Sequence, residues 1–238
     1  MQTDLVSTIL PGLLSSPKYV PQWYTYDKLG SELFDRVTNE NPDYHLYRVE
    51  MSLLKEHTDK IIDNFDETSV FAELGAGNSS KMHRLIEAIL KKEGSLRFIP
   101  IDISKEYVEE SAKNLIKLFP LLDVQPFVGH YLDGMVHVKS LQGSKLLVFL
   151  GSSFSSIPEA QMLPFLETIR DAIEERIGKT IDLEEGEVIH INSPGKTSIK
   201  WDWKQFEKLA KAAGLTTEQI WTDQDNLFTL GLMKADLQ

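Results

Sequence analysis

The chain has 238 residues, enough for one α/β domain with an elaboration, and 42% of them are hydrophobic, so it can bury a sizeable core. A net charge of −11, with no block of lysine or arginine, argues against broad electrostatic binding to nucleic acid or to an anionic membrane. The absence of cysteine excludes disulfides, thiolate catalysis and cysteine-ligated metals.

The first residues, MQTDLVSTIL, carry no basic region ahead of an apolar stretch. No apolar run approaches the roughly 20 residues that a bilayer-spanning helix needs. We therefore expect a cytoplasmic protein without a signal peptide.

In chain order, the hydrophobic pattern predicts a helical segment over residues 1–60, followed by alternating strands and helices over residues 61–238. The expected strands are 70–74, 97–101, 124–128, 145–150, 187–191, 220–221 and 228–233, the last two forming a hairpin across 223–226. The expected helices are 79–92, a helix capped by Ser104 and extending to Phe119, 158–173, and 203–213, which Gly214 ends.

Two of these helices show one apolar face each. The residues that we expect to be buried are Met82, Leu85, Ile86 and Ile89 in the first, and Val108, Leu115, Ile116 and Phe119 in the second. Alternation of strands and helices predicts an α/β fold with a mostly parallel sheet and helices on both faces. Ligands of such sheets bind outside the carboxyl ends of the strands.

One candidate site follows the first strand, in the sequence VFAELGAGNSSK (residues 70–81). Gly75 and Gly77 have no Cβ and can let a ligand approach the backbone closely. Ser80 stands where the dinucleotide motif has its third glycine, so a nucleoside-type ligand is favoured over a pyrophosphate. We call residues 75–81 the glycine loop.

A carboxylate completes this site. Asp102 ends the second strand, where nucleotide-binding sheets place an acid that accepts hydrogen bonds from ribose hydroxyls. The alternative interpretation is that Asp102 caps the helix that begins near Ser104. The pattern of loop and acid together favours cofactor binding.

Several stretches together resemble the histidine-specific, S-adenosylmethionine (SAM)-dependent methyltransferases, which include the histidine N-methyltransferase of the ergothioneine pathway and fungal dimethylallyltryptophan N-methyltransferases. These stretches are YDKLGSELFDRVT (26–38), DYHLYRVE (43–50), ELGAGNSSK (73–81), FIPIDIS (98–104), FLGSSFSSI (149–157) and KAAGL with the later WTD and FTLGLM (211–233). The resemblance implies a Rossmann-like class I methyltransferase domain, SAM as cofactor, and a small amine or amino acid as the methyl acceptor.

The resemblance also implies roles for individual residues. The implied cofactor-binding residues are Glu73, Gly75, Gly77, Lys81, Asp102, Gly129, His130, Tyr131 and Gly151. The implied substrate-binding residues are Tyr26, His45, Gly151, Ser156 and Ser198, of which Tyr26 and Ser198 are also candidate catalytic residues. The N-terminal segment, residues 1–60, would then cover the substrate, and residues 61–238 would bind the cofactor.

Some positions depart from the family pattern. His130 replaces an aspartate beside adenine, His45 replaces a tyrosine, and Ser156 replaces an asparagine that holds the amino acid. Much of the family's substrate insertion is missing between residues 173 and 199. Two other hypotheses therefore stay open: a non-catalytic relative that binds SAM or S-adenosylhomocysteine (SAH), with a possible protein partner, and a methyltransferase for a larger acceptor.

Other polar and aromatic residues favour structural roles. The six histidines show no metal-ligand spacing, so we expect no metal site. The serines after residue 151 lack the nucleophile-elbow pattern. Tyr44 and Tyr47 are expected to pack the N-terminal helices, whereas Tyr26 belongs to a motif of the family.

Overall fold

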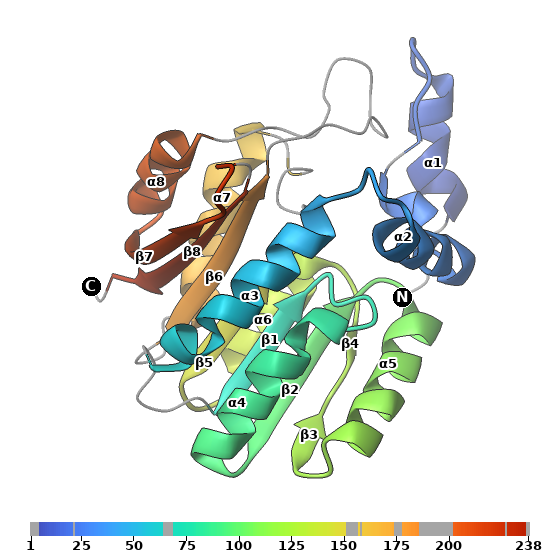
Figure 1. The fold of residues 1–238 in the computed structure, drawn as a ribbon. Coiled ribbons are helices and arrows are strands. Elements are labelled where there is room, and N and C mark those ends of the chain that lie inside the picture. The colour runs from blue at the N-terminus through green and yellow to red at the C-terminus, as the bar shows by residue number, and fades with distance from the viewer. Residues whose placement is uncertain are drawn as a thin grey trace.

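The computed structural model describes residues 5–20, 22–63, 69–150, 157, 159–173, 178–185, 202–226 and 228–236. Within these ranges the chain forms three layers, a central sheet with helices on both of its faces (Figure 1). The predicted α/β fold with a mostly parallel sheet is confirmed.

Within the described residues the sheet has eight strands. Seven follow one another in the order β3 (Leu122–Val124), β2 (Leu96–Asp102), β1 (Val70–Leu74), β5 (Lys145–Phe149), β6 (Gly178–Glu185), β8 (Phe228–Ala235) and β7 (Leu215–Thr222). The eighth, β4 (Phe127–Val128), also pairs with β2. The pairs from β3 to β6 are parallel, whereas β8 is antiparallel to both β6 and β7.

The central strands match their predictions because their apolar runs are buried. Every residue of β1 and of β5 is buried. The predicted hairpin at the C-terminus is also confirmed, although β7 begins at Leu215 and not at residue 220.

Two strand predictions were incomplete or wrong. The strand expected at 124–128 is divided into β3 and β4, since Pro126 between them has no N–H to give to a ladder. The sequence pattern also missed β6, which pairs with β5 in the centre of the sheet. The strand predicted at 187–191 lies outside the described residues.

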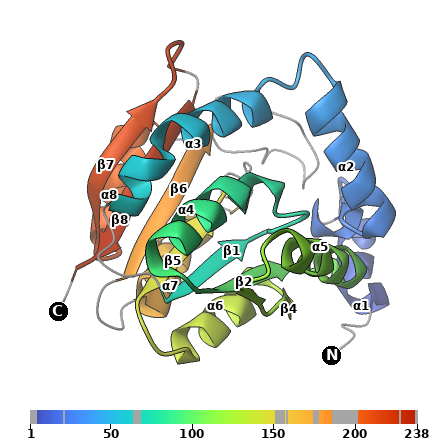
Figure 2. The same cartoon turned by 60° about the horizontal axis from the view of Figure 1, so that its bottom comes forward.

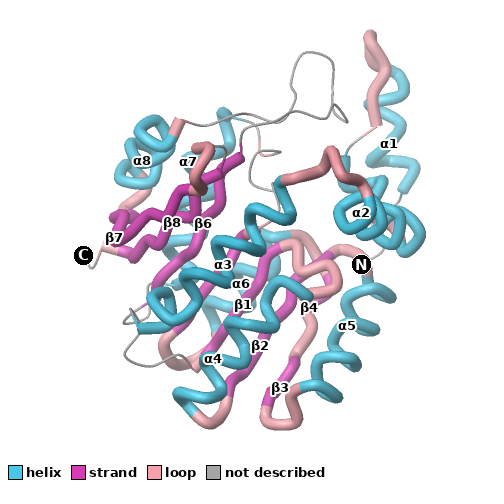
Figure 3. Tube along the Cα trace, in the orientation of Figure 1, coloured by secondary structure: helices cyan, strands magenta, loops and turns pink. Residues whose placement is uncertain are grey.

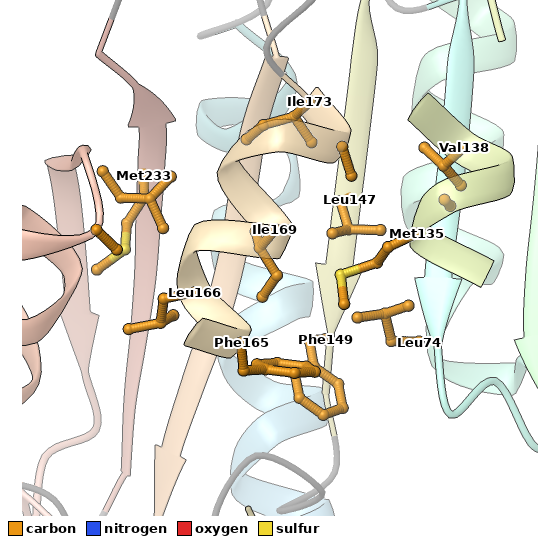
Figure 4. Close-up of a cluster of buried hydrophobic side chains, with 14 of the residues drawn as sticks. Leu74, Met135, Val138, Leu147, Phe149, Phe165, Leu166, Ile169, Ile173 and Met233 are labelled. Carbon is orange, nitrogen blue, oxygen red and sulfur yellow. The ribbon is translucent and has the colours of Figure 1, made fainter. Parts of the chain in front are cut away.

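The helices divide between the two faces of the sheet (Figure 2). The helices α3 (Leu46–Asp63) and α4 (His83–Glu93) bury apolar residues against one face, and α6 (Tyr131–Ser140), α7 (Glu159–Ile173) and α8 (Trp203–Ala212) do so against the other. The four residues expected on the buried face of the helix at 79–92 are all buried: Met82 in the short 3-10 helix η2 (Ser80–Met82), and Leu85, Ile86 and Ile89 in α4. Figure 4 shows the hydrophobic core on the face covered by α6, α7 and α8, where Phe149 of β5 and Phe165 of α7 pack with their ring centroids 5.6 Å apart.

The helix α5 (Lys105–Leu118) lies beside β2 and β3. Its Val108 and Leu115 are buried as predicted, but Ile116 is 47% exposed, because α5 covers the edge of the sheet with one narrow face. Ser104 occupies the predicted N-cap position, yet its hydroxyl makes no capping hydrogen bond. The position of the N-cap is therefore as predicted, but the hydrogen bond at the start of α5 is the one that the N–H of Ser104 donates to Oδ1 of Asp102.

The N-terminal residues form α1 (Leu5–Leu14), the short 3-10 helix η1 (Gln22–Thr25) and α2 (Lys28–Glu40) ahead of α3. The helix α2 contacts α5 near the end of the sheet that carries the loop after β1 (Figure 3). The division expected at residue 60 falls within α3, whose apolar face belongs to the core. None of the described helices combines the length and the apolar character that crossing a membrane requires.

Candidate functional site

The glycine loop leaves the carboxyl end of β1 with an unusual backbone. Gly75 and Gly77 have φ values of 68° and 53°, in the left-handed region that glycine adopts without strain. The N–H groups of Gly75 and Ala76 both donate to the carbonyl oxygen of Ile101, at 2.9 and 3.1 Å. These bonds hold the start of the loop against the end of β2.

Asp102 is turned toward this loop. Its Oδ2 accepts a hydrogen bond of 2.9 Å from the N–H of Gly77, and its Oδ1 accepts one of 2.9 Å from the N–H of Ser104. Burial raises the pKa of Asp102, and the hydrogen bonds from Ser104, Gly77 and Ile103 oppose that rise. The carboxylate thus orders the loop and also the start of α5, and each oxygen retains a lone pair that a ribose hydroxyl could use.

Glu73, in β1 one residue before the strand ends, is the most perturbed acid near the site. Its side chain is buried, and Oε2 has no hydrogen-bond partner among the described residues. Burial raises the pKa of Glu73 to about 8, and the hydroxyl of Ser79 and the charge of Lys81 offset only part of that rise. A buried acid without a full set of partners suits a ligand cation, such as the ammonium of a methionine moiety.

Lys81 ends the glycine loop and is bound to the helix α3. Its ammonium forms an ion pair with the buried Glu50 and lies 5.5 Å from the centre of the Tyr47 ring. The Tyr47 hydroxyl is also 3.4 Å from Oγ of Ser80. The expected packing role of Tyr47 therefore includes contacts with the loop, whereas binding of the cofactor by Lys81 stays a prediction.

The segment Gly129-His130-Tyr131 reaches the same end of the sheet. The N–H of Gly129 donates to the carbonyl oxygen of Asp102 at 3.0 Å, so the structure brings these two predicted residues together. His130 is exposed at the N-cap of α6. Tyr131 is half-buried, and its ring packs edge-on against Phe149, with the ring centroids 5.1 Å apart.

The predicted substrate residues are only partly described. Tyr26 is half-buried and makes an edge-to-face contact with Phe34 of α2, at 5.9 Å between ring centroids. His45 precedes α3, with Nδ1 3.3 Å from the carbonyl oxygen of Asp43. Gly151, Ser156 and Ser198 lie outside the described residues.

Three further residues at the site were not predicted from the sequence: Asn78 within the glycine loop, and Asp35 and Tyr107, which lie beside it. Oδ2 of Asp35 accepts hydrogen bonds from Nδ2 of Asn78, at 2.6 Å, and from the hydroxyl of Tyr107. Asp35 and Asn78 both fall within motifs quoted above for the resemblance, but their contact spans 43 positions of the chain, and no local pattern reveals it.

No group of three or more histidine, aspartate or glutamate side chains with the arrangement of a metal site occurs in the part of the chain that the structure describes. The glycine loop, Asp102 and Glu73 instead form a site of backbone N–H groups and carboxylates. Such a site fits a ligand with hydroxyls and an ammonium group, like an adenosyl amino acid.

Comparison with known protein families matches residues 5–180 and 172–235 to the family described as histidine-specific methyltransferase, SAM-dependent. The histidine N-alpha-methyltransferase of Mycolicibacterium smegmatis is 29% identical over 163 residues, which are 68% of this chain and 50% of the relative. The protein of the same name from Mycobacterium tuberculosis is 30% identical over 162 residues, 66% of this chain and 49% of the relative. The chain thus spans about half the length of these curated relatives.

A fungal relative is also similar over a shorter stretch. The 4-dimethylallyltryptophan N-methyltransferase of Claviceps purpurea is 28% identical over 115 residues, 48% of this chain and 33% of the relative.

Two solved structures are similar in fold. The 1,6-didemethyltoxoflavin-N1-methyltransferase of Burkholderia thailandensis, solved with SAH, has a TM-score of 0.60 at 13% identity and covers 94% of each chain. The magnesium protoporphyrin IX methyltransferase of Synechocystis, also solved with SAH, has a TM-score of 0.61 at 10% identity, covering 88% of this chain and 96% of the other. At these identities the likeness shows the fold alone, which is Rossmann-like.

Proposed function

Because the chain belongs to the family of histidine-specific, SAM-dependent methyltransferases, we propose that it transfers the methyl group of SAM to the amino group of a small acceptor. The acceptor class that we propose is an amino acid such as histidine or a tryptophan derivative, the substrates named for the relatives. The single observation that carries the proposal is the hydrogen bond from the N–H of Gly77 to Asp102, which joins the glycine loop to the acid of β2.

The residues at the carboxyl end of the sheet divide the work of holding the cofactor. Asp102 would accept hydrogen bonds from the two ribose hydroxyls, while the glycine loop would lie against the amino-acid part. Glu73 would ionise on pairing with the ammonium group, which supplies the partner that its Oε2 otherwise lacks. Gly129, His130 and Tyr131 would border the adenine.

The cofactor, when bound, supplies an activated methyl group on a sulfonium. The protein has to hold the acceptor nitrogen in line with that group, and such orientation accounts for several kcal/mol of a reaction barrier (roughly 7–11 at best). We assign this task to Tyr26 and His45, together with Gly151, Ser156 and Ser198 of the family motifs.

The acceptor must also lose a proton, because the α-amino group of a free amino acid is mostly protonated at neutral pH. Tyr26 is half-buried beside Phe34, at the side of the molecule where α2 meets the loop. We assign it contact with the acceptor amine; a water held by Ser198 is the other route for the proton.

The test is incubation of the purified chain with SAM carrying a labelled methyl group and a panel of histidine, tryptophan and related amines. We expect label in at least one amine, with transfer abolished in Asp102→Ala. Binding of SAH without transfer to any acceptor would contradict the proposal.

A second candidate is a protein that binds SAM or SAH without catalysis, possessing the cofactor site and lacking part of the substrate site. The observation that favours it is the coverage of only about half of the curated relatives. The same experiment separates the two, because a binding protein retains SAH affinity and transfers no label. An acceptor larger than an amino acid would instead appear as label in added peptide or protein.

A further inference from the structure

Asp35 lies in the middle of α2, outside every role assigned so far. It is half-buried, and its Oδ2 accepts hydrogen bonds from Nδ2 of Asn78 in the glycine loop and from the hydroxyl of Tyr107 on α5. Burial and the bond to Asp35 both raise the pKa of Tyr107, so its hydroxyl remains a donor at any physiological pH. One carboxylate therefore joins three elements of the fold.

Asn78 transmits this contact into the loop. While Nδ2 donates to Asp35, Oδ1 accepts a hydrogen bond of 2.9 Å from the N–H of Ser80. Because the amide group is planar, fixing one of its ends fixes the other. The bond spans Ser79, a buried residue with a left-handed φ of 52°, a conformation that costs roughly 1–2 kcal/mol for a residue with a Cβ.

The glycine loop and the start of α5, which lie on two sides of the candidate site, are both linked to Asp35. Asn78 directly follows Gly77, whose N–H donates to Asp102. Tyr107 lies in the first turn of α5, just after the Asp102–Ser104 hydrogen bond that begins this helix. A movement of Asp35 would therefore change the position of the loop and of the start of α5 together.

The attachment of α2 is mostly polar. Its only buried residues are Ser31 and Thr38, while its large apolar residues Leu29, Leu33 and Val37 are exposed. Since little apolar surface holds α2 in place and its 3.5 Å ion pair between Lys28 and Glu110 is exposed and therefore weak, we assign a large share of its docking to the hydrogen bonds of the half-buried Asp35.

The same helix carries the aromatic contact of Tyr26. Phe34, the neighbour of Asp35 in the chain, packs against both Tyr26 and Tyr44, and Asp27 caps the helix by accepting from the N–H of Gly30 at 2.7 Å. The position of α2 thus determines where Tyr26 lies.

We infer that Asp35 is a positioning residue that couples the docking of α2 to the shape of the SAM site. A loop held in its binding conformation favours docked α2, and docked α2 favours SAM, since such coupling is reciprocal for binding free energies. This inference rests on the proposed function only in taking SAM as the ligand. It makes the docking of α2, and with it the position of Tyr26, dependent on cofactor binding.

The test compares four proteins: the wild type, Asp35→Ala, Asp35→Asn and Glu40→Ala. Glu40 is the matched control, because it is an acid on the same helix whose described ion pair, with Arg36, is exposed. Two quantities are measured: the Kd of SAH by calorimetry, and the rate of hydrogen exchange at the amides of residues 28–40 with and without SAH.

For Asp35→Ala we expect the Kd of SAH to rise at least about fivefold, the lower end of common coupling factors. Asp35→Asn should recover part of this loss, because its amide oxygen can still accept a hydrogen bond. Glu40→Ala should bind as the wild type does. SAH should slow exchange in α2 of the wild type and of Glu40→Ala, and should leave it unchanged in Asp35→Ala.

A double mutant identifies the route. The double mutant Asp35→Ala/Asn78→Ala is compared with the wild type. If Asp35 acts through Asn78, its Kd for SAH should exceed that of the wild type by a factor clearly smaller than the product of the two single-mutant factors. A lowered melting temperature in Asp35→Ala with a wild-type Kd would overturn the inference and leave the proposed function standing. Failure of the wild type to bind SAH would overturn both.

Discussion

The interior of the sheet and its carboxyl edge differ in the interactions that hold them, which are apolar in the interior and polar at the edge. Along β1 and β5 every residue is buried, and the packing is dominated by apolar contacts such as that between Phe71 and Phe98, at 5.2 Å between ring centroids. At the carboxyl ends of β1 and β2 the chain instead has the buried acid Glu73 with an unpartnered oxygen, the left-handed glycines that follow β1, and the Asp102 carboxylate, which accepts hydrogen bonds from two backbone N–H groups. The first region stabilises the fold. The second contains strained and unpartnered groups that lower the stability of the fold and that suit a ligand site.

The largest expected effect lies in the interior. Phe71→Ala should lower the free energy of unfolding by about 3–5 kcal/mol, because it leaves a cavity beside Phe98 in a fully buried strand. Chemical denaturation measures this loss. The matched control is Leu118→Ala at an exposed position, which should change the stability by less than about 0.5 kcal/mol. If the folded Phe71→Ala protein also lost affinity for SAH, the two regions would not be separable.

The reverse pattern is expected at the edge for Asp102→Ala. The Kd of SAH should rise by at least about 30-fold, since hydrogen bonds to charged groups contribute roughly 1.5–3 kcal/mol each. Calorimetry measures this, with Asp123→Ala as the control, an exposed aspartate on the neighbouring strand β3. An unchanged Kd in Asp102→Ala would remove the ribose contact from the account.

The ionisation of Glu73 makes the stability of the protein depend on pH. Its folded-state pKa of about 8 lies above the ordinary 4.5, so the folded protein binds the proton more tightly than the unfolded chain does. The free energy of unfolding of the wild type should therefore fall, through this group, as pH rises from about 4.5 to about 8.

Glu73→Gln lacks this titration. Its stability relative to the wild type should increase between pH 5 and pH 8, by up to about 1.4 kcal/mol for each pH unit over which only the folded protein keeps the proton. Thermal unfolding across this pH range measures the difference, and SAH affinity should be weakened in the same variant. A difference in stability that does not change with pH would show that Glu73 is ionised throughout.

The smallest expected effect is that of Gly77→Ala, about 1 kcal/mol of stability, from the cost of a Cβ at positive φ. The added Cβ would lie 3.8 Å from Cε1 of Tyr107, an ordinary contact, so the cost is confined to the backbone. Gly94→Ala is the control, because its φ is 78° and nothing lies within 4 Å of the added atom. Both variants should have a lower melting temperature than the wild type, but only Gly77→Ala should also bind SAH more weakly.

The sequence predicted the interior better than the edge. Apolar runs such as 70–74 and 145–150 identify buried strands directly, because removing apolar side chains from water stabilises the fold. The strand β6 was missed, since its sequence, GKTIDLEE, is mostly polar and charged. Pairing with β5 and β8 places it in the sheet regardless.

At the edge, the residue types were predictable and their connections were not. The positive φ of Gly75 and Gly77 and the position of Asp102 follow from local patterns. The contacts of Asp35 with Asn78 and of Glu50 with Lys81 join residues that are far apart in the chain. The packing of α2 and α3 beside the loop creates them, and a local pattern contains no trace of that packing.

A crystal structure of the chain grown with SAH tests the central claim most directly. The account predicts that both ribose hydroxyls lie within hydrogen-bonding distance of Asp102 and that the ammonium group of the ligand contacts Glu73. An adenosyl group bound elsewhere on the sheet, with Asp102 still bonded only to Gly77 and Ser104, would contradict it.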